Sequence, residues 1–401
     1  MIAILHSGLW PMSVLGKVIY TLVLTHIAII AVTVYFHRAQ AHRSIEVHPY
    51  LGLFFRVWIW MTSTMVTTHW VAVHRKHHAK VETPEDPHSP RIHGILAIFF
   101  NGVSYYRRER NNPETIKKYS IGCPNDWFER SLIASPIFMQ NVGSLIMMLI
   151  NIVLFGVKSG FLIWLVQMLW MPVLAAGGIN GLGHYFGYRN YSTEDDSTNI
   201  MPWGILIGGE ELHNNHHAFP TSPKLSMKAF EFDIGYVYIK LFERLQWIKI
   251  KQKPMSLDQP AEKISDIIRA KVLLLSKLDK QVIMPLLKKK KQYLKSLNKY
   301  SYSEIKQVLL RPFLDANQNQ LKLIDFIKSQ DDDLSLVLLL KAQLESIYSK
   351  RLRSNEYMHQ LRLWCDEAER SCLRSMKNYI IDLKAFMGNV DSGSFCVAAN
   401  E

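Results

Sequence analysis

The sequence predicts an all-α protein in which helices cross a membrane and a charged helical region follows them. The chain has 401 residues, 48% of them hydrophobic. Its mean hydropathy of 0.00 conceals an apolar first half and a Lys-rich last third. Long apolar segments also lie beside three short histidine clusters. We therefore expect a membrane-embedded region over residues 1–250 and a charged helical cytosolic region over residues 251–401.

Three segments are expected to span the membrane. Residues 14–36 are long and apolar enough for one helix. Residues 132–155 and 161–183 form two more spans, joined by a tight hairpin at residues 156–160. Residues 74–131 are rich in Lys and Arg, which marks the cytoplasmic side of a membrane. The N-terminus is then outside and the histidine clusters are inside.

Two further apolar segments are expected to lie at the membrane surface. Residues 50–72 contain Arg56, which would be costly in lipid. Histidines precede and follow this segment, and ligands on opposite sides of a bilayer cannot share one metal site. The segment is therefore interfacial, or it enters the membrane and returns on the same side. Residues 226–250 mix aromatic and charged side chains, which is typical of a surface helix.

Charge and cysteine content restrict the partners and the compartment. The formal net charge of +13 comes from basic residues that flank apolar segments. This placement favours contact with membrane lipids and argues against nucleic acid. The run Lys288–Lys291 predicts a solvated face, with membrane or partner contact as the alternative. The cysteines have no paired spacing and are expected to be reduced thiols: Cys123, Cys365, Cys372 and Cys396.

The histidine clusters have the spacing of metal ligands. Positions i, i+3 and i+4 share one face of a helix. The second cluster (His74, His77 and His78) and the third (His213, His216 and His217) each have this spacing, so each presents three imidazoles together. Neutral imidazole is the commonest protein ligand of transition metals. Another histidine follows an asparagine by one helical turn, so the candidate set is His37, His42, His74, His77, His78, His184, His213, His216, His217 and Asn180.

The number of these imidazoles predicts two metal ions. His37 and His42 are five residues apart, about 140° around an ideal helix, which suits two neighbouring ions better than one. Nine imidazoles also exceed the four to six ligands that one ion usually holds. We therefore predict a dinuclear, all-nitrogen site. The other histidines lack this pattern and are expected to be structural, some of them beside the ligands: His6, His26, His48, His69, His88, His93 and His359.

The chain carries no sequence motif for a redox cofactor of its own. No G-x-G-x-x-G motif follows a strand, and no haem or iron–sulfur cysteine spacing is present. If the metals perform redox chemistry, electrons must come from another protein.

Several ordered motifs together resemble the membrane fatty acid desaturase family, and within it the acyl-CoA Δ9 (stearoyl-CoA type) group on its bacterial branch. The third cluster begins with His213, where acyl-lipid desaturases often carry glutamine. The resemblance covers roughly residues 14–250. Its motifs are H-R-x-x-x-H-R at residues 37–43, H-R-x-H-H at 74–78, D-P-H-S at 86–89, N-x-x-x-H-x-x-G-Y-R at 180–189 and G-G-E-x-x-H-N-x-H-H-x-F-P at 208–220.

The resemblance implies an oxygen-dependent desaturase that places a cis double bond, at Δ9, in a saturated acyl-CoA chain. It implies a di-iron centre and dioxygen as co-substrate. Zinc is expected as a substitute in overproduced protein, because imidazole sites bind zinc more tightly than ferrous iron. One iron would be held by His37, His78, His184 and His217, with Asn180 acting through a water. The other would be held by His42, His74, His77, His213 and His216.

The same resemblance extends to partners and location. A separate electron carrier, a ferredoxin, rubredoxin or b-type cytochrome with its reductase, would supply electrons. The protein would lie in the bacterial inner membrane with its active site on the cytosolic face. By rough alignment, Arg107 and Arg108 would bind the coenzyme A phosphates.

Two other functions are compatible with the histidine pattern. A di-iron hydroxylase of lipids or alkanes would use the same ligands and differ in geometry at the ångström scale. A non-redox zinc-binding receptor or a metal transporter would bind metal without turnover. A transporter would place polar ligands inside the membrane spans, whereas the histidines here lie at the ends of the spans.

Overall fold

The computed structural model describes residues 7–134, 138–252, 257, 260–313, 316–350, 352–371 and 373–388. The chain forms two compact units. Unit 1 holds residues 1–190 and 195–254, and unit 2 holds residues 191–194 and 255–401. The short segment 191–194 thus belongs to unit 2, although its neighbours on both sides belong to unit 1. Among the predicted histidines and thiols, His6, Cys372 and Cys396 lie outside the described residues, whereas Cys123 and Cys365 are free thiols.

Two helices of unit 1 are long and apolar enough to cross a membrane, by length and composition. The first runs over Val14–Ala41 with a mean hydropathy of 2.1, and the second over Phe138–Leu182 with the same value. The first begins where the Ser13 hydroxyl accepts a hydrogen bond from the N–H of Gly16 at 3.1 Å. It consists of α2 (Val14–Ile30) and a π-helical continuation, η1 (Ala31–Ala41).

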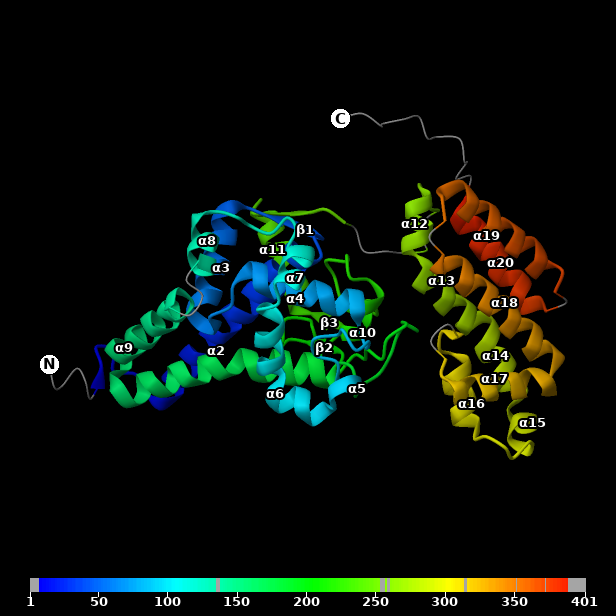
Figure 1. The fold of residues 1–401 in the computed structure, drawn as a ribbon, viewed down its shortest axis with the longest axis horizontal. Coiled ribbons are helices and arrows are strands. Elements are labelled where there is room, and N and C mark those ends of the chain that lie inside the picture. The colour runs from blue at the N-terminus through cyan, green and yellow to red at the C-terminus, as the bar shows by residue number, and fades with distance from the viewer. Residues whose placement is uncertain are drawn as a thin grey trace. The chain divides into compact units, whose positions relative to one another are not determined.

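The second long helix is folded back on itself. It consists of α9 (Phe138–Met171) and π-helical η2 (Pro172–Leu182), and Gly156 breaks it with φ 78° and ψ 166°. Only glycine adopts such a conformation without strain. The break lies within the connection expected at residues 156–160. Asn151 donates to Gln167 at 3.0 Å between the two arms, which run side by side in Figure 1.

The apolar segment 50–72 is two helices. α3 (Pro49–Ser63) ends at Thr64, whose φ of 58° is left-handed, and α4 (Thr67–Lys80) then starts in a new direction. At about 1.5 Å per residue, α3 is shorter than the roughly 30 Å core of a bilayer. Arg56 is buried and paired with Asp126 at 2.9 and 2.5 Å, so its charge is compensated inside the protein.

Short helices and two small sheets complete unit 1. β1 (Ile45–Val47) pairs antiparallel with β4 (Ile248–Ile250), and β2 (Trp203–Gly204) pairs parallel with β3 (Phe232–Asp233). Buried Arg38 donates to Asp233, the residue that caps α11. The other helices are α5 (Pro90–His93), α6 (Ile95–Arg110), α7 (Pro113–Tyr119), α8 (Trp127–Ala134), α10 (His213–Ala218) and α11 (Ile234–Arg244).

Unit 2 is a helical bundle around an aliphatic core. Its longer helices, α17 to α20, follow one another as antiparallel neighbours in Figure 1. A buried Lys341 is the unusual member of this interior. The helices are α12 (Ile264–Arg269), α13 (Lys271–Leu278), π-helical η3 (Asp279–Ile283), α14 (Met284–Lys289), α15 (Lys291–Ser296), α16 (Tyr302–Leu309), α17 (Gln318–Gln330), α18 (Asp332–Ser349), α19 (Ser354–Glu369) and α20 (Arg374–Met387).

Candidate metal centre

The first histidine cluster is shaped by the π-helical end of the first long helix. The N–H of His42 donates to the carbonyl of His37 at 3.0 Å, a bond across five residues. Such a bond closes a π turn, which brings residues five apart onto one side of the helix. The two ring centroids are therefore 4.7 Å apart. The prediction that His37 and His42 suit two neighbouring ions assumed α-helical geometry, whereas the helix has a π turn here.

The second and third clusters each divide between two groups of imidazoles. On α4, His74 and His78 belong to one group and His77 to the other. On α10, His216 belongs to the first group, whereas His213 and His217 belong to the second. His184, just after η2, completes the second group. We call them the His37 group (His37, His42, His74, His78 and His216) and the His77 group (His77, His184, His213 and His217).

Ring nitrogens converge within each group, with one ligand atom per residue and all of these atoms within 4.8 Å of one another. In the His37 group, Nε2 of His216 lies 3.1 Å from Nε2 of His37 and 2.8 Å from Nε2 of His78. In the His77 group, Nε2 of His213 lies 3.1 Å from Nε2 of both His184 and His217.

This grouping differs from the partition that the family resemblance implied, and that partition stays a prediction. Each H-x-x-H-H cluster is divided between the groups, as expected. However, His37 and His78 join His42 and His74, and do not share a group with His184 and His217. The π turn accounts for His37, and the four-residue spacing on α4 places His78 beside His74.

Four carboxylates contact the Nδ1 atoms of these histidines. Within the His77 group, Asp86 contacts His77 at 3.0 Å, Asp195 contacts His217 at 2.7 Å and Glu82 contacts His184 at 3.4 Å. In the His37 group, Glu210 contacts His37 at 2.8 Å. A carboxylate at Nδ1 holds the proton there and leaves the lone pair on Nε2. None of the four was predicted as a site residue, although Asp86 and Glu210 lie in the D-P-H-S and G-G-E motifs.

The donor set fits metal ions. Nε2 atoms that face each other at 2.8–3.1 Å need either a proton on one of them or a cation that both of them bind. A separation of about 3 Å is what adjacent nitrogens have around one ion at about 2.1 Å from each. Nε2 of His77 is buried with no hydrogen-bond partner among the described residues. Burial lowers the pKa well below the usual value, which favours the neutral, ligating form, for His42, His74, His78, His213 and His216.

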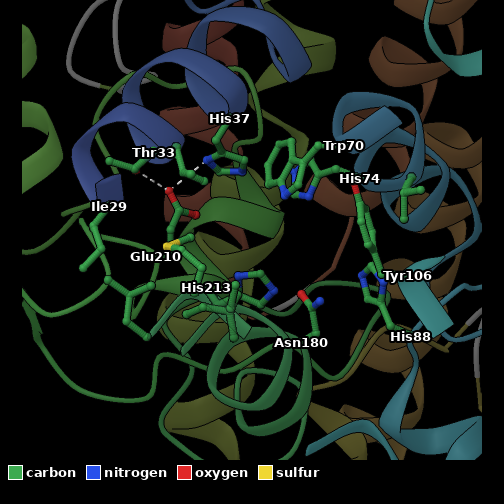
Figure 2. Close-up of a pocket in the computed structure, with 16 residues that line it drawn as sticks. Ile29, Thr33, His37, Trp70, His74, His88, Tyr106, Asn180, Glu210 and His213 are labelled. Atoms are coloured by element: carbon green, nitrogen blue, oxygen red, sulfur yellow. Dashed lines mark hydrogen bonds and ion pairs between the residues drawn. The ribbon is translucent and has the colours of Figure 1, made fainter. Parts of the chain in front are cut away.

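A cavity opens beside both groups. Figure 2 shows His37, His74 and His213 at its wall, with Asn180 and Tyr106 nearby. Asn180 thus faces the same space as the imidazoles, as expected for a residue that acts near the metals. The remaining wall is largely apolar and comes from the two long helices and their neighbours: Ile29, Val32, Val73, Met171, Ala175, Ile179 and Ile207.

The remaining predicted residues lie elsewhere. Arg107 and Arg108 are exposed on α6 and do not line the cavity. His88 is buried, lines the cavity and lies against the His77 ring, with centroids 4.5 Å apart. His26 has a structural contact, with its Nε2 3.1 Å from the Tyr238 hydroxyl. His48 accepts a hydrogen bond from the N–H of Tyr50 at the start of α3.

Comparison with known proteins identifies the family. The family described as "Fatty acid desaturase" matches residues 10–227. A Delta-9 acyl-lipid desaturase of Arabidopsis thaliana is 27% identical over 58% of this chain and 73% of its own length. An sn-1 stearoyl-lipid 9-desaturase of Anabaena variabilis is 26% identical over 54% of this chain and 76% of its own length. Since the family match spans more than half of the 401 residues and contains both histidine groups, the chain belongs to the fatty acid desaturase family.

Proposed function

We propose that this chain is an oxygen-dependent desaturase that introduces a cis double bond, at Δ9, into a saturated fatty acyl chain. The observation that carries the proposal is the pair of buried imidazole groups beside an apolar cavity, in a member of the desaturase family. The Δ9 position is supported by the names of the relatives, which are Delta-9 and 9-desaturases.

The two histidine groups would each hold one iron ion. The bound irons supply the redox chemistry that couples reduction of dioxygen to cleavage of two unactivated C–H bonds. Overall, two hydrogens of adjacent methylenes, two electrons and two protons convert one dioxygen into two waters, and a C=C bond forms. Iron suits this reaction because zinc has no redox chemistry.

The side chains of this protein position the reactants. The apolar wall from Ile29 to Ile207 would hold the acyl chain and exclude water, so that one pair of methylenes lies beside the imidazole groups. Asn180 offers a polar contact at the same wall, where it would hold a water at the metals. The carboxylates at Nδ1 orient the ligating rings and increase their basicity.

The acyl carrier distinguishes two candidate substrates. His213 at the start of the third cluster supports a saturated acyl-CoA, for which Arg107 and Arg108 on α6 are candidate phosphate ligands. The named relatives support an acyl lipid instead, since they are acyl-lipid and stearoyl-lipid desaturases. We propose the acyl-CoA, and supplying stearoyl-CoA or stearoyl-lipid separately to the purified protein distinguishes the two.

Electrons would come from a separate carrier with its reductase, since the sequence has no motif for a flavin, haem or iron–sulfur centre. The carrier would be a ferredoxin, a rubredoxin or a b-type cytochrome. It would dock on the cytosolic face of the bacterial inner membrane, where the basic stretch 74–131 is expected.

The test is turnover by the iron-loaded protein in lipid vesicles, with carrier, reductase, NAD(P)H, dioxygen and a saturated acyl substrate. Mass spectrometry of the product would locate the double bond. We expect a Δ9 product from the unaltered chain and from His359→Ala, a control that removes an exposed histidine of α19. We expect none from His74→Ala. A hydroxylated product would support the hydroxylase alternative, and bound metal without turnover would support the zinc-binding one.

A further inference from the structure

The cavity beside the two histidine groups differs in polarity from side to side. Its volume is about 80 Å³, which is room for water, since one water needs roughly 10–15 Å³ of such space. Figure 2 shows His88, Tyr106 and Asn180 on the side away from Glu210. The polar groups near Glu210 are paired, because Thr33 donates to Oε1 of Glu210 at 2.7 Å. We call His88, Tyr106 and Asn180 the His88 side of the cavity.

The imidazole of His88 has no partner within the described part of the chain. The residue is 5% exposed, and neither Nδ1 nor Nε2 makes a hydrogen bond there. A neutral imidazole presents one N–H and one lone pair, so a donor and an acceptor are both buried and unpaired. Such an arrangement is unfavourable in a folded protein. Because His88 lines the cavity, a small ligand inside the cavity can satisfy both nitrogens.

Asp86 fixes His88 beside the metal centre. Its Oδ1 accepts a hydrogen bond from the N–H of His88 at 3.2 Å and lies 3.0 Å from Nδ1 of His77. The rings of His77 and His88 have centroids 4.5 Å apart. The carboxylate that orients one ligand of the His77 group therefore also places an unpaired imidazole next to that ligand.

A third metal ion is the alternative partner of His88, since His77, Asp86 and His88 lie close enough to bind one ion. Both oxygens of Asp86 already accept hydrogen bonds, however, because Oδ2 accepts from the N–H of Glu82 at 2.8 Å. An ion would have to displace these donors, including the proton on Nδ1 of His77. Water at His88 requires no such displacement, and the geometry therefore favours water.

Tyr106 supplies a second unpaired group on the same side. It lies on α6, which packs against η2, the helix that carries Asn180. The Tyr106 hydroxyl is buried and makes no hydrogen bond to any described residue. Buried tyrosine hydroxyls usually have a hydrogen-bond partner. Since Tyr106 and His88 line one cavity, the same small ligand or a short chain of them can satisfy both.

The proposed reaction gives a reason for such a site. Each double bond formed would convert one dioxygen into two waters, next to an apolar wall that takes the acyl chain. Water gains nothing from contact with methylene groups, whereas a hydrogen-bonded position beside the metals holds it at little cost. Separate places for water and for the acyl chain would therefore let both occupy one cavity.

We propose that His88 and Tyr106, with Asn180, bind water of the reaction on the His88 side of the cavity and keep it apart from the acyl chain. One ring nitrogen of His88 and the hydroxyl of Tyr106 donate to this water, and the other ring nitrogen accepts. The inference rests on the proposed function and extends it, because it gives His88 and Tyr106 contact with a product.

A structure of the zinc-loaded full chain that resolves ordered water tests the site without turnover. We expect water within about 2.5–3.2 Å of a ring nitrogen of His88 and of the Tyr106 hydroxyl. In Tyr106→Phe, the water at the hydroxyl should be lost while both zinc ions stay. An unaltered protein with no water at either residue would overturn the inference.

Azide binding to the oxidised, iron-loaded protein gives a second measure. Azide accepts hydrogen bonds and binds ferric iron, and its absorption band reports the fraction bound. One lost hydrogen bond corresponds to roughly a fivefold effect, so we expect an about fivefold higher Kd for azide in Tyr106→Phe and in His88→Ala. Elemental analysis should find two ions in both variants. Loss of an ion from His88→Ala would identify His88 as a metal ligand and overturn the inference.

The matched controls are Tyr105→Phe and His93→Ala, which change the same residue types a few positions away. The rings of Tyr105 and His93 stack on each other with centroids 4.4 Å apart, and neither residue is among the described ones that line the cavity. We expect the Kd for azide to stay unchanged in both. Equal weakening by the controls, or unchanged azide binding in Tyr106→Phe and His88→Ala, would refute the site. A failure of the unaltered protein to bind iron would instead overturn the proposed function.

Discussion

The two histidine groups reach similar arrangements by different means. The His37 group has five imidazoles, and one of them, His37, has a carboxylate at Nδ1. The His77 group has four imidazoles, and three of them have carboxylates there, from Asp86, Glu82 and Asp195. The His37 group therefore has more imidazoles, whereas the His77 group has more carboxylates around fewer imidazoles.

The difference shows two ways of orienting a ring in a buried site. In the His37 group, helix geometry brings the rings together, through the π turn at His37 and His42, whose rings meet edge to face, and through the four-residue spacing of His74 and His78. In the His77 group, loop residues hold the rings through hydrogen bonds. We therefore expect the first group to be sensitive to helix geometry and the second to single carboxylates.

The largest effect is expected from removing a ligand. His74 and His77 lie on α4 but belong to different groups. Either His74→Ala or His77→Ala should reduce turnover below detection, because loss of a ligand exceeds the roughly 10–100-fold effect of losing an outer partner. Elemental analysis should find one of the two ions missing in each variant, and anomalous scattering should find a different ion missing. Loss of the same ion in both variants would contradict the grouping.

Replacing the metal should be nearly as severe. Both groups offer only imidazole nitrogens, which bind zinc more tightly than ferrous iron. Protein produced with excess zinc should therefore carry zinc in both groups and show no turnover, and exchange for iron should restore it. Different rates of zinc-for-iron exchange in the two groups would distinguish one group from the other. Full turnover with zinc alone would show that the reaction is not redox chemistry.

Removing one carboxylate should have an intermediate effect. Asp86→Asn and Glu210→Gln each weaken the hold on one Nδ1–H, at His77 and His37 respectively. We expect about 10–100-fold lower metal affinity in the affected group only. Calorimetric or competition titration with ferrous iron measures this. Equal weakening of both groups by Asp86→Asn would show that the groups are not independent.

The smallest effect is expected from salt. The imidazole groups are buried, so added salt should leave metal retention unchanged, whereas docking of an acidic electron carrier on the basic surface should weaken. The Debye length, beyond which exposed charges are screened, falls from about 8 Å at physiological ionic strength to about 3 Å at 1 M salt. Turnover at saturating acyl substrate should therefore fall severalfold across that range. A constant rate would contradict electrostatic docking and leave the metal centre unaffected.

The histidines that the sequence singled out converge in the structure, because imidazoles at helical spacing are informative by themselves. The sequence did not predict the π turn that brings His37 and His42 together, since nothing in residues 31–41 distinguishes a π turn from an α turn by pattern. The carboxylates Glu82 and Asp195 were missed for another reason. They reach His184 and His217 from loops far along the chain, and periodicity carries no information about such contacts.

The fold, like the metal centre, was predicted only in part from the sequence. Apolar length predicted the long helices, and Gly156, where the second one breaks, lies within the expected hairpin. The apolar run 50–72 looked continuous, but Thr64 ends one helix and α4 begins soon after it, a turn that no Gly or Pro marks.

The π-helical end of the first long helix has a consequence for how such a chain can change over generations. A π turn is equivalent to an α-helix with one inserted residue, so deleting one residue between His37 and His42 would restore α-helical winding. The two imidazoles would then lie four residues apart and still share one face, about 40° from each other, since each residue rotates an α-helix by about 100°. A chain of this kind could therefore lose this residue and keep both imidazoles on one side of the helix, whereas α-helical winding at the present five-residue spacing would set them about 140° apart.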